Sequence, residues 1–185
     1  GNYGGAVRIQ NTTAVVANCW IRNNDANTGA GFGGGGGIFA RSSSVTLDSN
    51  KIENNAATRG GAIYLYAASG VVANNTTTGN TVAIGGITDP TGAGVAIENC
   101  AGVTLTDNTI VSNSGAKDGG GVWIRNATGV DLQGGSVRQH AVTSGGGGVF
   151  VSSSDATLQR CEFWSNSTAF AGGGVASFDT SSVTI

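Results

Sequence analysis

The sequence has few charged residues. Only 11% of its 185 residues are charged, and the formal net charge is −2, whereas about a quarter of the residues are charged in a typical globular domain. So few charges without a basic excess argue against nucleic acid as a partner and against electrostatic attachment to a membrane surface. No apolar run approaches the roughly 20 residues that cross a bilayer. We therefore expect no direct membrane insertion.

Other residue types are scarce as well. Pro90 is the single proline, methionine is absent, and only three cysteines and one histidine are present. An odd number of cysteines does not suggest a disulfide framework. No signal-peptide pattern is visible. Because the chain begins at Gly1 and stops inside the strand-like SSVTI, we expect it to be a fragment of a longer protein that continues at both ends.

Glycine, by contrast, is abundant, with 33 residues. Its clusters recur along the chain, and each is followed by a triplet in which the first residue is always apolar and the third usually is. The first apolar residues of these triplets, here called the first anchors, lie 25 to 32 residues apart. They are Val7, Ile38, Ile63, Val95, Val122, Val149 and Val175. Such self-similarity at a nearly fixed interval is typical of repeat architectures.

Two further apolar columns keep the same register. The second anchors follow the first by nine or ten residues: Val16, Leu47, Val72, Leu105, Leu132, Leu158 and Ile185. The third anchors lie five residues beyond the second: Ile21, Ile52, Thr77, Ile110, Val137 and Phe163. Each unit thus contains three short segments of period two, with no helical periodicity. A unit this thin cannot bury its own apolar side, so successive units must stack.

The simplest stack is an all-β, single-stranded parallel β-helix, a solenoid of about six to seven coils with three short strands each. We expect residues 1–185 to form one such β-helical domain. Glycine clusters would sit at corners, where unusual backbone dihedrals are needed. Two coils carry extra residues, at 25–35 and 81–93, and these are expected to bulge from one edge as loops.

A polar column stands three residues after each third anchor. Its members are Asn24, Asn55, Asn80, Asn113, His140 and Asn166. Inward amides at a turn can bond the coil's own backbone and the amides of neighbouring coils, so this column predicts an internal asparagine ladder. His140 and its neighbour Arg138 could also form a general-base site. We favour the ladder role, since imidazole supplies one donor and one acceptor.

The cysteines fit the same scheme. Cys19 and Cys161 occupy one inward column but are five coils apart, which is too far for a disulfide. We expect both to be small buried thiols. Cys100 is expected in a turn, where it is either exposed or paired with a segment outside this chain.

With these columns aligned, the chain resembles the pectate-lyase-like right-handed parallel β-helices, and more narrowly the repeats of polymorphic outer-membrane proteins and bacterial surface adhesins. The motifs that carry the resemblance are GGAV (4–7), GGAI (60–63) and FWSN (163–166), with IRNN, IENN and IVSN as variants. The resemblance implies the right hand of the coil. It does not decide activity, because one fold hosts many functions.

Enzymes of the fold that the chain resembles use clustered carboxylates, often with calcium. The eleven acids here are scattered, and no column carries two acids on adjacent coils. A carboxylate pair could still form across a loop through Asp25 or Asp89. We therefore predict no cofactor and no metal, and we favour a protein that is not an enzyme. The alternative is a polysaccharide lyase or a glycoside hydrolase of the pectate-lyase-like superfamily.

The functional prediction rests on residues between inward anchors. Strand side chains alternate, so an aromatic stripe consisting of Phe39, Tyr64, Trp123 and Phe150 is expected to face outward. Exposed aromatic surface suits a protein partner, a glycan, or flanking segments of the same chain. Trp20 and Trp164 would be isolated surface residues on the third face.

We accordingly expect a structural or adhesive segment of a secreted or cell-surface protein, whose bare ends pack on flanking sequence or on other subunits, as in a filament. Sequons suggest N-glycosylation at Asn11, Asn74 and Asn126, with further matches at Asn75 and Asn166.

Overall fold

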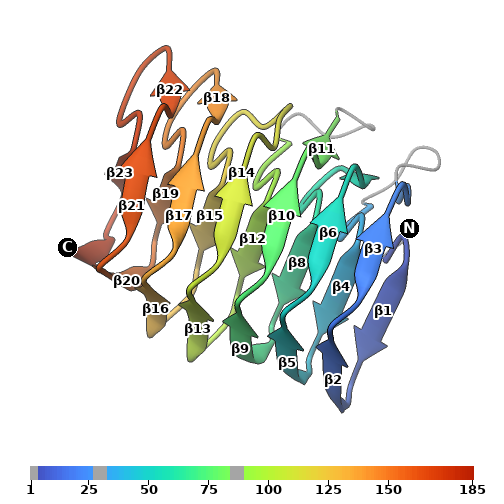
Figure 1. Cartoon of the computed structure of the whole chain (residues 1–185). Helices are drawn as coiled ribbons and strands as arrows, with labels where there is room; N and C mark the ends of the chain where they lie inside the picture. The colour runs from blue at the N-terminus through green and yellow to red at the C-terminus, as the bar shows by residue number, and fades with distance from the viewer. Residues whose placement is uncertain (1–3, 27–32, 84–89) are drawn as a thin grey trace.

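The computed structural model describes residues 4–26, 33–83 and 90–185. Its strands form three long sheets and two short ones. Each coil adds a strand to each long sheet in turn, and every pairing between named strands is parallel (Figure 1). The all-β parallel β-helix predicted from the repeats is therefore confirmed. No helix among the described residues is long and apolar enough to cross a membrane.

The first sheet contains the strands that follow the glycine clusters. They are β1 (Val7–Gln10), β4 (Ile38–Arg41), β8 (Ile63–Tyr66), β12 (Val95–Glu98), β15 (Val122–Arg125), β19 (Val149–Ser152) and β23 (Val175–Phe178). The second sheet contains β2 (Thr13–Ala17), β5 (Ser44–Asp48), β9 (Ser69–Ala73), β13 (Val103–Thr106), β16 (Val130–Gln133), β20 (Asp155–Gln159) and β24 (Ser182–Thr184).

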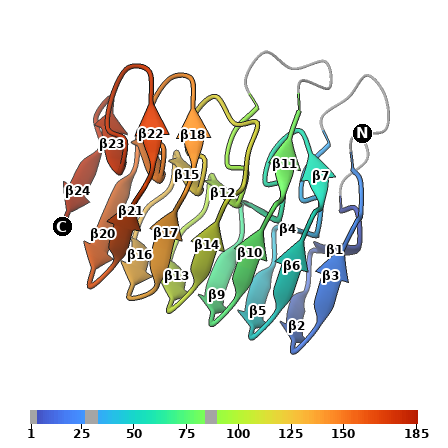
Figure 2. The ribbon, with the colours of Figure 1, turned by 45° about the horizontal axis from the view of Figure 1, so that its top comes forward.

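The third sheet contains β3 (Trp20–Arg22), β6 (Lys51–Glu53), β10 (Thr76–Thr78), β14 (Thr109–Val111), β17 (Ser136–Arg138) and β21 (Glu162–Trp164). Beyond it lie two short pairs, β7 (Ala56–Ala57) with β11 (Thr81–Val82), and β18 (Ala141–Val142) with β22 (Ser167–Thr168). Figure 2 shows these short strands continuing past the ends of the third sheet, where they form a lobe outside the three-sided coil.

The pairing register follows the anchor columns residue by residue. Ile38 pairs with Ile63 in the first sheet, Leu47 with Val72 in the second, and Ile110 with Val137 in the third. The apolar anchors of the inner coils form one continuous buried core, and those of the end coils pack against it partly buried. Ile185 is the exception to the prediction, because it is the last residue of the chain and 82% exposed. Thr77, the one polar third anchor, is also buried, and its hydroxyl accepts a hydrogen bond from the side chain of Asn113 at 3.3 Å. A threonine is thus tolerated in the core because its hydroxyl has a partner.

The glycine clusters occupy corners, as predicted. The glycine three residues before each first anchor has a positive φ, for example 67° at Gly35 and 58° at Gly60. The following glycine meets a second restriction. A Cβ on Gly36 would lie 2.3 Å from the carbonyl oxygen of Gly61 in the next coil. One glycine is therefore required for its backbone angle and the next for the close contact between coils.

The predicted asparagine ladder is present inside the corner after the third sheet. The Oδ1 of Asn80 accepts from both the backbone N–H and the side chain of Asn55, at 3.0 Å each. Its Nδ2 donates to Asn113 Oδ1 at 2.9 Å and to the carbonyl of Ile52 at 2.9 Å. One buried amide thus satisfies backbone groups of two coils and joins a third.

A second ladder lies at the corner between the second and third sheets. Asn50 donates through Nδ2 to Asn75 Oδ1 at 2.9 Å, and Asn75 donates to Asn108 Oδ1 at 3.1 Å. The remaining corner uses smaller side chains. The hydroxyl of Ser154 accepts from the N–H of Ala127, and the Sγ of Cys100 accepts from the N–H of Ala68. All three corners therefore bind the next coil through a side chain.

These bonds correct the predictions for cysteine. Cys100 is only 3% exposed and belongs to this corner row, so it is neither an exposed thiol nor one available for pairing. Burial raises the pKa of its thiol. Cys19 is exposed and Cys161 half-buried, rather than buried, because they belong to the outermost coils described. All three cysteines are free.

Replacing Asn80 by alanine should destabilise the fold strongly. It would leave the buried carbonyl of Ile52 and the N–H of Asn55 without their partners, at about 1–3 kcal/mol for each unsatisfied group. Chemical denaturation should show a loss of about 2–6 kcal/mol in the free energy of unfolding. Asn99→Ala is the matched control. It is exposed, and Ala67 already occupies the equivalent position with a similar positive φ. Equal losses in both variants would contradict the ladder's role.

His140 replaces one ladder asparagine and keeps the direction of the hydrogen bonds. Its Nδ1 lies 3.0 Å from Asn166 Oδ1, and its Nε2 lies 3.4 Å from Asn113 Nδ2. These neighbours assign the proton to Nδ1, which donates, and leave Nε2 as acceptor. Burial lowers the pKa of His140 to about 4. The neutral ring is a ladder member, and the general-base role has no support in this geometry.

The fold should lose stability in acid because of His140. With a pKa near 6.5 in the unfolded chain and about 4 in the folded one, the unfolded state binds the proton first as pH falls. The contribution of neutral His140 to the free energy of unfolding is fully present above pH 6.5 and decreases by about 3 kcal/mol by pH 4. His140→Asn should remove this part of the pH dependence while changing little at pH 7. Parallel unfolding curves for both proteins at pH 4, 5.5 and 7 test this, and identical pH profiles would contradict it.

Candidate functional site

The predicted aromatic stripe is not exposed. Phe39, Tyr64 and Trp123 do lie on the outer side of the first sheet, but they are 1%, 4% and 3% exposed. Only Phe150 is half-buried, and it stacks on Phe178 with ring centres 5.3 Å apart. The alternation that placed these side chains outside the coil is correct. The prediction that side chains outside the coil are exposed to solvent is wrong.

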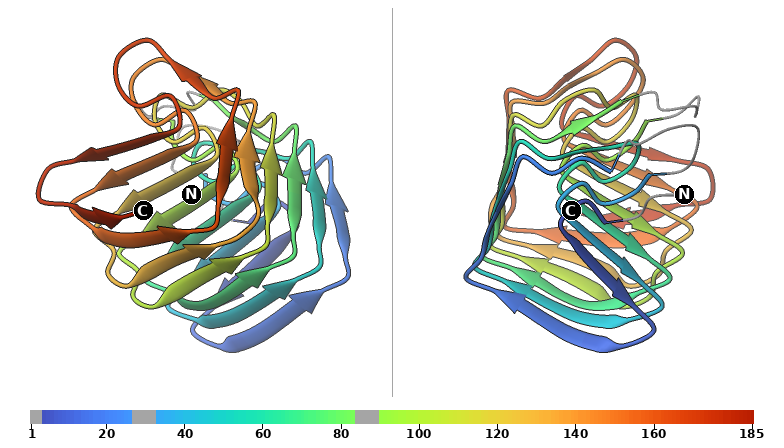
Figure 3. Two further views of the ribbon diagram at one scale, coloured as in Figure 1. Left: turned by 60° about the vertical axis from the view of Figure 1, so that its left-hand side comes forward. Right: turned by 90° about the vertical axis from the view of Figure 1, so that its right-hand side faces the viewer.

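The reason is the lobe, whose described residues fold back over the first sheet (Figure 3). Lobe residues of successive coils form parallel bridges with one another. Gly34 pairs with Arg59, Arg59 with Thr91, and Thr91 with Asp118. The Cζ of Arg59 lies 5.7 Å from the ring centre of Trp123. The lobe thus covers the stripe, which forms a second apolar cluster outside the main core.

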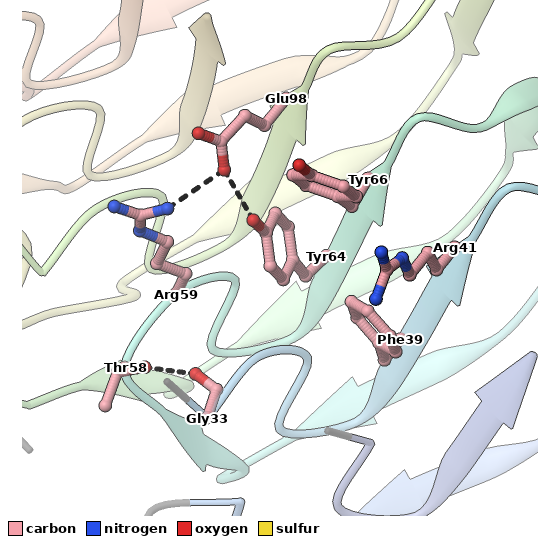
Figure 4. A pocket seen from close by; sticks show the side chains of 8 residues that line it. All are labelled: Gly33, Phe39, Arg41, Thr58, Arg59, Tyr64, Tyr66 and Glu98. Atoms are coloured by element: carbon pink, nitrogen blue, oxygen red, sulfur yellow. Dashed lines mark hydrogen bonds and ion pairs between the residues drawn. The ribbon is translucent and has the colours of Figure 1, made fainter. Parts of the chain in front are cut away.

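A pocket lies over the stripe beside the described part of the lobe. Its volume is about 270 Å³, and it lies between the lobe and the strands β4, β8 and β12 (Figure 4). The lobe contributes Gly33, Thr58 and Arg59, and the strands contribute Phe39, Arg41, Tyr64, Tyr66 and Glu98. Its walls are therefore aromatic rings and its polar groups come mainly from two arginines and one glutamate. The hydroxyl of Thr58 donates to the carbonyl of Gly33 and fixes the edge of the lobe.

Glu98 organises one side of the pocket. Its Oε2 accepts from the Arg59 guanidinium at 2.9 Å and from the Tyr64 hydroxyl at 2.5 Å. Burial and then Glu98 raise the pKa of Tyr64, so its phenol stays protonated and donates. Burial disfavours the Arg59 charge, but Glu98 and Tyr64 outweigh it and raise the pKa of Arg59. The Arg59–Glu98–Tyr64 trio links the lobe to the first sheet and forms one wall of the pocket.

Arg41 and Tyr66 form the opposite, more accessible side. Arg41 is exposed and its Cζ lies 5.5 Å from the ring centre of Tyr66, which is half-buried. Tyr66 in turn packs edge-on against Tyr64 with ring centres 6.1 Å apart. The pocket thus combines a partly buried ion pair on one side with an exposed cation on the other.

Sequence reasoning found only two of the lining residues, Phe39 and Tyr64. Arg41, Tyr66 and Glu98 occupy the next outward position of the same strands and pair with one another across coils. Extending the alternation by two residues would have identified them. Arg59 gives no such signal, because only the path of the lobe brings it to this face.

The remaining candidates lie elsewhere. Asn11, Asn74 and Asn126 are exposed at turns with positive φ. The other two sequon residues, Asn75 and Asn166, are ladder members that hydrogen-bond within the fold. Trp20 and Trp164 are surface residues of the third sheet, 57% and 46% exposed. Residues 27–32 and 84–89 of the predicted loops 25–35 and 81–93 lie outside the described residues, and Asp89 is among them.

Acidic residues do not gather at the pocket. Asp131 and Asp155, on adjacent coils, line one hollow of about 280 Å³ on the second sheet, a proximity that column alignment missed. Both are bonded locally, Asp155 to the N–H of Gly129 and Asp131 to the side chain of Gln133. Within the described part of the chain, no three histidine, cysteine or acidic residues are grouped so that they could hold a metal ion.

Stacked parallel coils with internal side-chain ladders define a β-solenoid, and comparison with known families gives its kind. The family model described as the right handed beta helix region matches residues 1–137 and 87–185. The chain belongs to this family. Comparisons with curated proteins and with solved structures gave no match. The narrower likeness to pectate-lyase-like enzymes and to polymorphic outer-membrane repeats stays a prediction.

Trp123→Ala should destabilise the fold because the indole is buried under the lobe. Truncating a buried tryptophan costs about 3–5 kcal/mol, and we expect that loss in equilibrium unfolding. Trp164→Ala, on the exposed third sheet, is the matched control and should cost less than about 1 kcal/mol. A Trp123→Ala protein as stable as the control would mean that the lobe does not cover the stripe.

Proposed function

We propose that this chain is a structural and adhesive segment of a secreted or cell-surface protein. It acts as a stiff shaft that contacts other protein subunits, flanking segments of its own chain, or glycans. Its stiffness is supported by the ladders, which join successive coils through buried amides. The internal polar side chains hydrogen-bond within the fold, so a partner would be bound by the outer surface.

The observation that carries the adhesive part is the ring-lined pocket beside exposed Arg41 and half-buried Tyr66. Tyrosine and arginine are enriched at sites of recognition, since both offer large contact area together with polar ends. The Arg59–Glu98–Tyr64 trio holds the opposite wall in place before a partner arrives. A site prepared in this way loses little conformational freedom on binding.

A secreted or surface location is part of the same proposal. The three exposed sequon residues Asn11, Asn74 and Asn126 would be accessible to a glycosylating enzyme. Their glycans would project from turns of the coil.

The alternative enzyme would need acid–base groups at the pocket. Glu98 is the carboxylate that lines it among the described residues, and it already accepts from two donors. A polysaccharide hydrolase uses a pair of carboxylates about 5–10 Å apart. The arrangement therefore favours binding over turnover.

Adhesion can be tested with the purified chain on a glycan array and in a retention assay on the glycans that score. Tyr66→Ala should reduce retention at least tenfold, since it removes the accessible ring of the site. Trp164→Ala, an aromatic truncation on another face, should leave retention unchanged. Equal retention by all three proteins would contradict adhesion through this site. If the chain released products from an acidic polysaccharide and Glu98→Gln abolished that release, the chain would be an enzyme instead.

A further inference from the structure

The charge balance of the pocket points to the kind of ligand it accepts. Two arginines and one glutamate line it. Glu98 is paired with Arg59 at 2.9 Å. Among the residues that the structure describes, Arg41 makes no ion pair with a carboxylate. The pocket therefore carries one positive charge that the fold does not compensate, at its accessible side.

The walls restrict the shape of that ligand. The rings of Phe39, Tyr64 and Tyr66 pack on one another along one side of the space, with 5.5 Å between the centres of the first two and 6.1 Å between those of the last two. The half-buried Tyr66 is the accessible ring of this wall. The volume of about 270 Å³ is below the range of about 300–1,000 Å³ typical of drug-sized ligands. The space suits one ring with a short substituent rather than several linked rings.

We propose that this pocket binds a carboxylate carried on a single six-membered ring. Arg41 receives the carboxylate, because the planar guanidinium matches its two oxygens. The flat face of the ring packs against the aromatic walls. This inference rests on the proposed function, since it names the chemistry that the adhesive site recognises. Both an aromatic acid and a sugar acid provide this group.

The rigid side of the pocket contributes selectivity. The Tyr64 hydroxyl and one Arg59 nitrogen already donate to Glu98 Oε2. A second carboxylate placed there would face Glu98 and be repelled. The ligand is thus oriented with its anionic end toward Arg41 and its ring toward Tyr64.

The probes are benzoate and glucuronate, with benzamide and glucose as neutral counterparts, titrated into the folded chain by calorimetry or NMR. We expect a dissociation constant on the order of 1 mM for at least one acid, and binding at least tenfold weaker for its neutral counterpart. Arg41→Gln should weaken binding of that acid at least tenfold. Arg125→Gln is the matched control, because Arg125 occupies the same outward row three coils further on and does not line the pocket.

The relative affinities of the two acids identify the source, with tighter benzoate indicating an aromatic acid and tighter glucuronate a sugar acid. Neutral compounds that bind as tightly as the acids would overturn the inference, as would an unchanged affinity in Arg41→Gln. Absence of binding by all four compounds to the folded protein would also overturn it. If the acids fail while Tyr66→Ala still abolishes retention on glycans, the adhesive function stands and only this inference falls.

Discussion

The structure depends on one constraint, which is that each turn of a coil must find partners for its backbone groups in the coils beside it. Strands do so through parallel pairing, whereas at the corners backbone bonds between coils supply only some of the partners. Here buried side chains complete the corners, with asparagine at two of them and serine or cysteine at the third. Because each amide bonds both neighbours, the coils stack in one register, and the apolar anchors are brought into line.

The same coil that closes the core also builds the site. Between the third sheet and the glycine cluster the chain makes an excursion, and this lobe covers aromatic rings that would otherwise face water. Where Arg59 reaches Glu98 and Tyr64, the covering becomes one wall of a pocket. The proposed recognition would therefore need no separate domain, since the lobe both covers the aromatic rings and lines the pocket.

The repeats were sufficient to predict the sheets, their register and the ladder, because those features follow from residues that recur at equal spacing. Features that depend on one copy of the repeat were not predictable in this way. The burial of Trp123 depends on where the lobe runs, and Arg59 meets Glu98 only through that path. Similarly, spacing placed Cys100 at a turn, but its burial depends on the thiol accepting from Ala68.

The coil that contains Gly135 and His140 differs from the others at both asparagine corners. Gly135 has no side chain, so the second ladder stops at Asn108, and the contact between Asn113 and His140 spans 3.4 Å rather than about 3 Å. Coils stacked in series carry an axial pull equally, so the joint with the weakest side-chain links gives way first. A shaft under tension would therefore part between the coils of Asn108 and Gly135, leaving two blocks that each keep their own ladder.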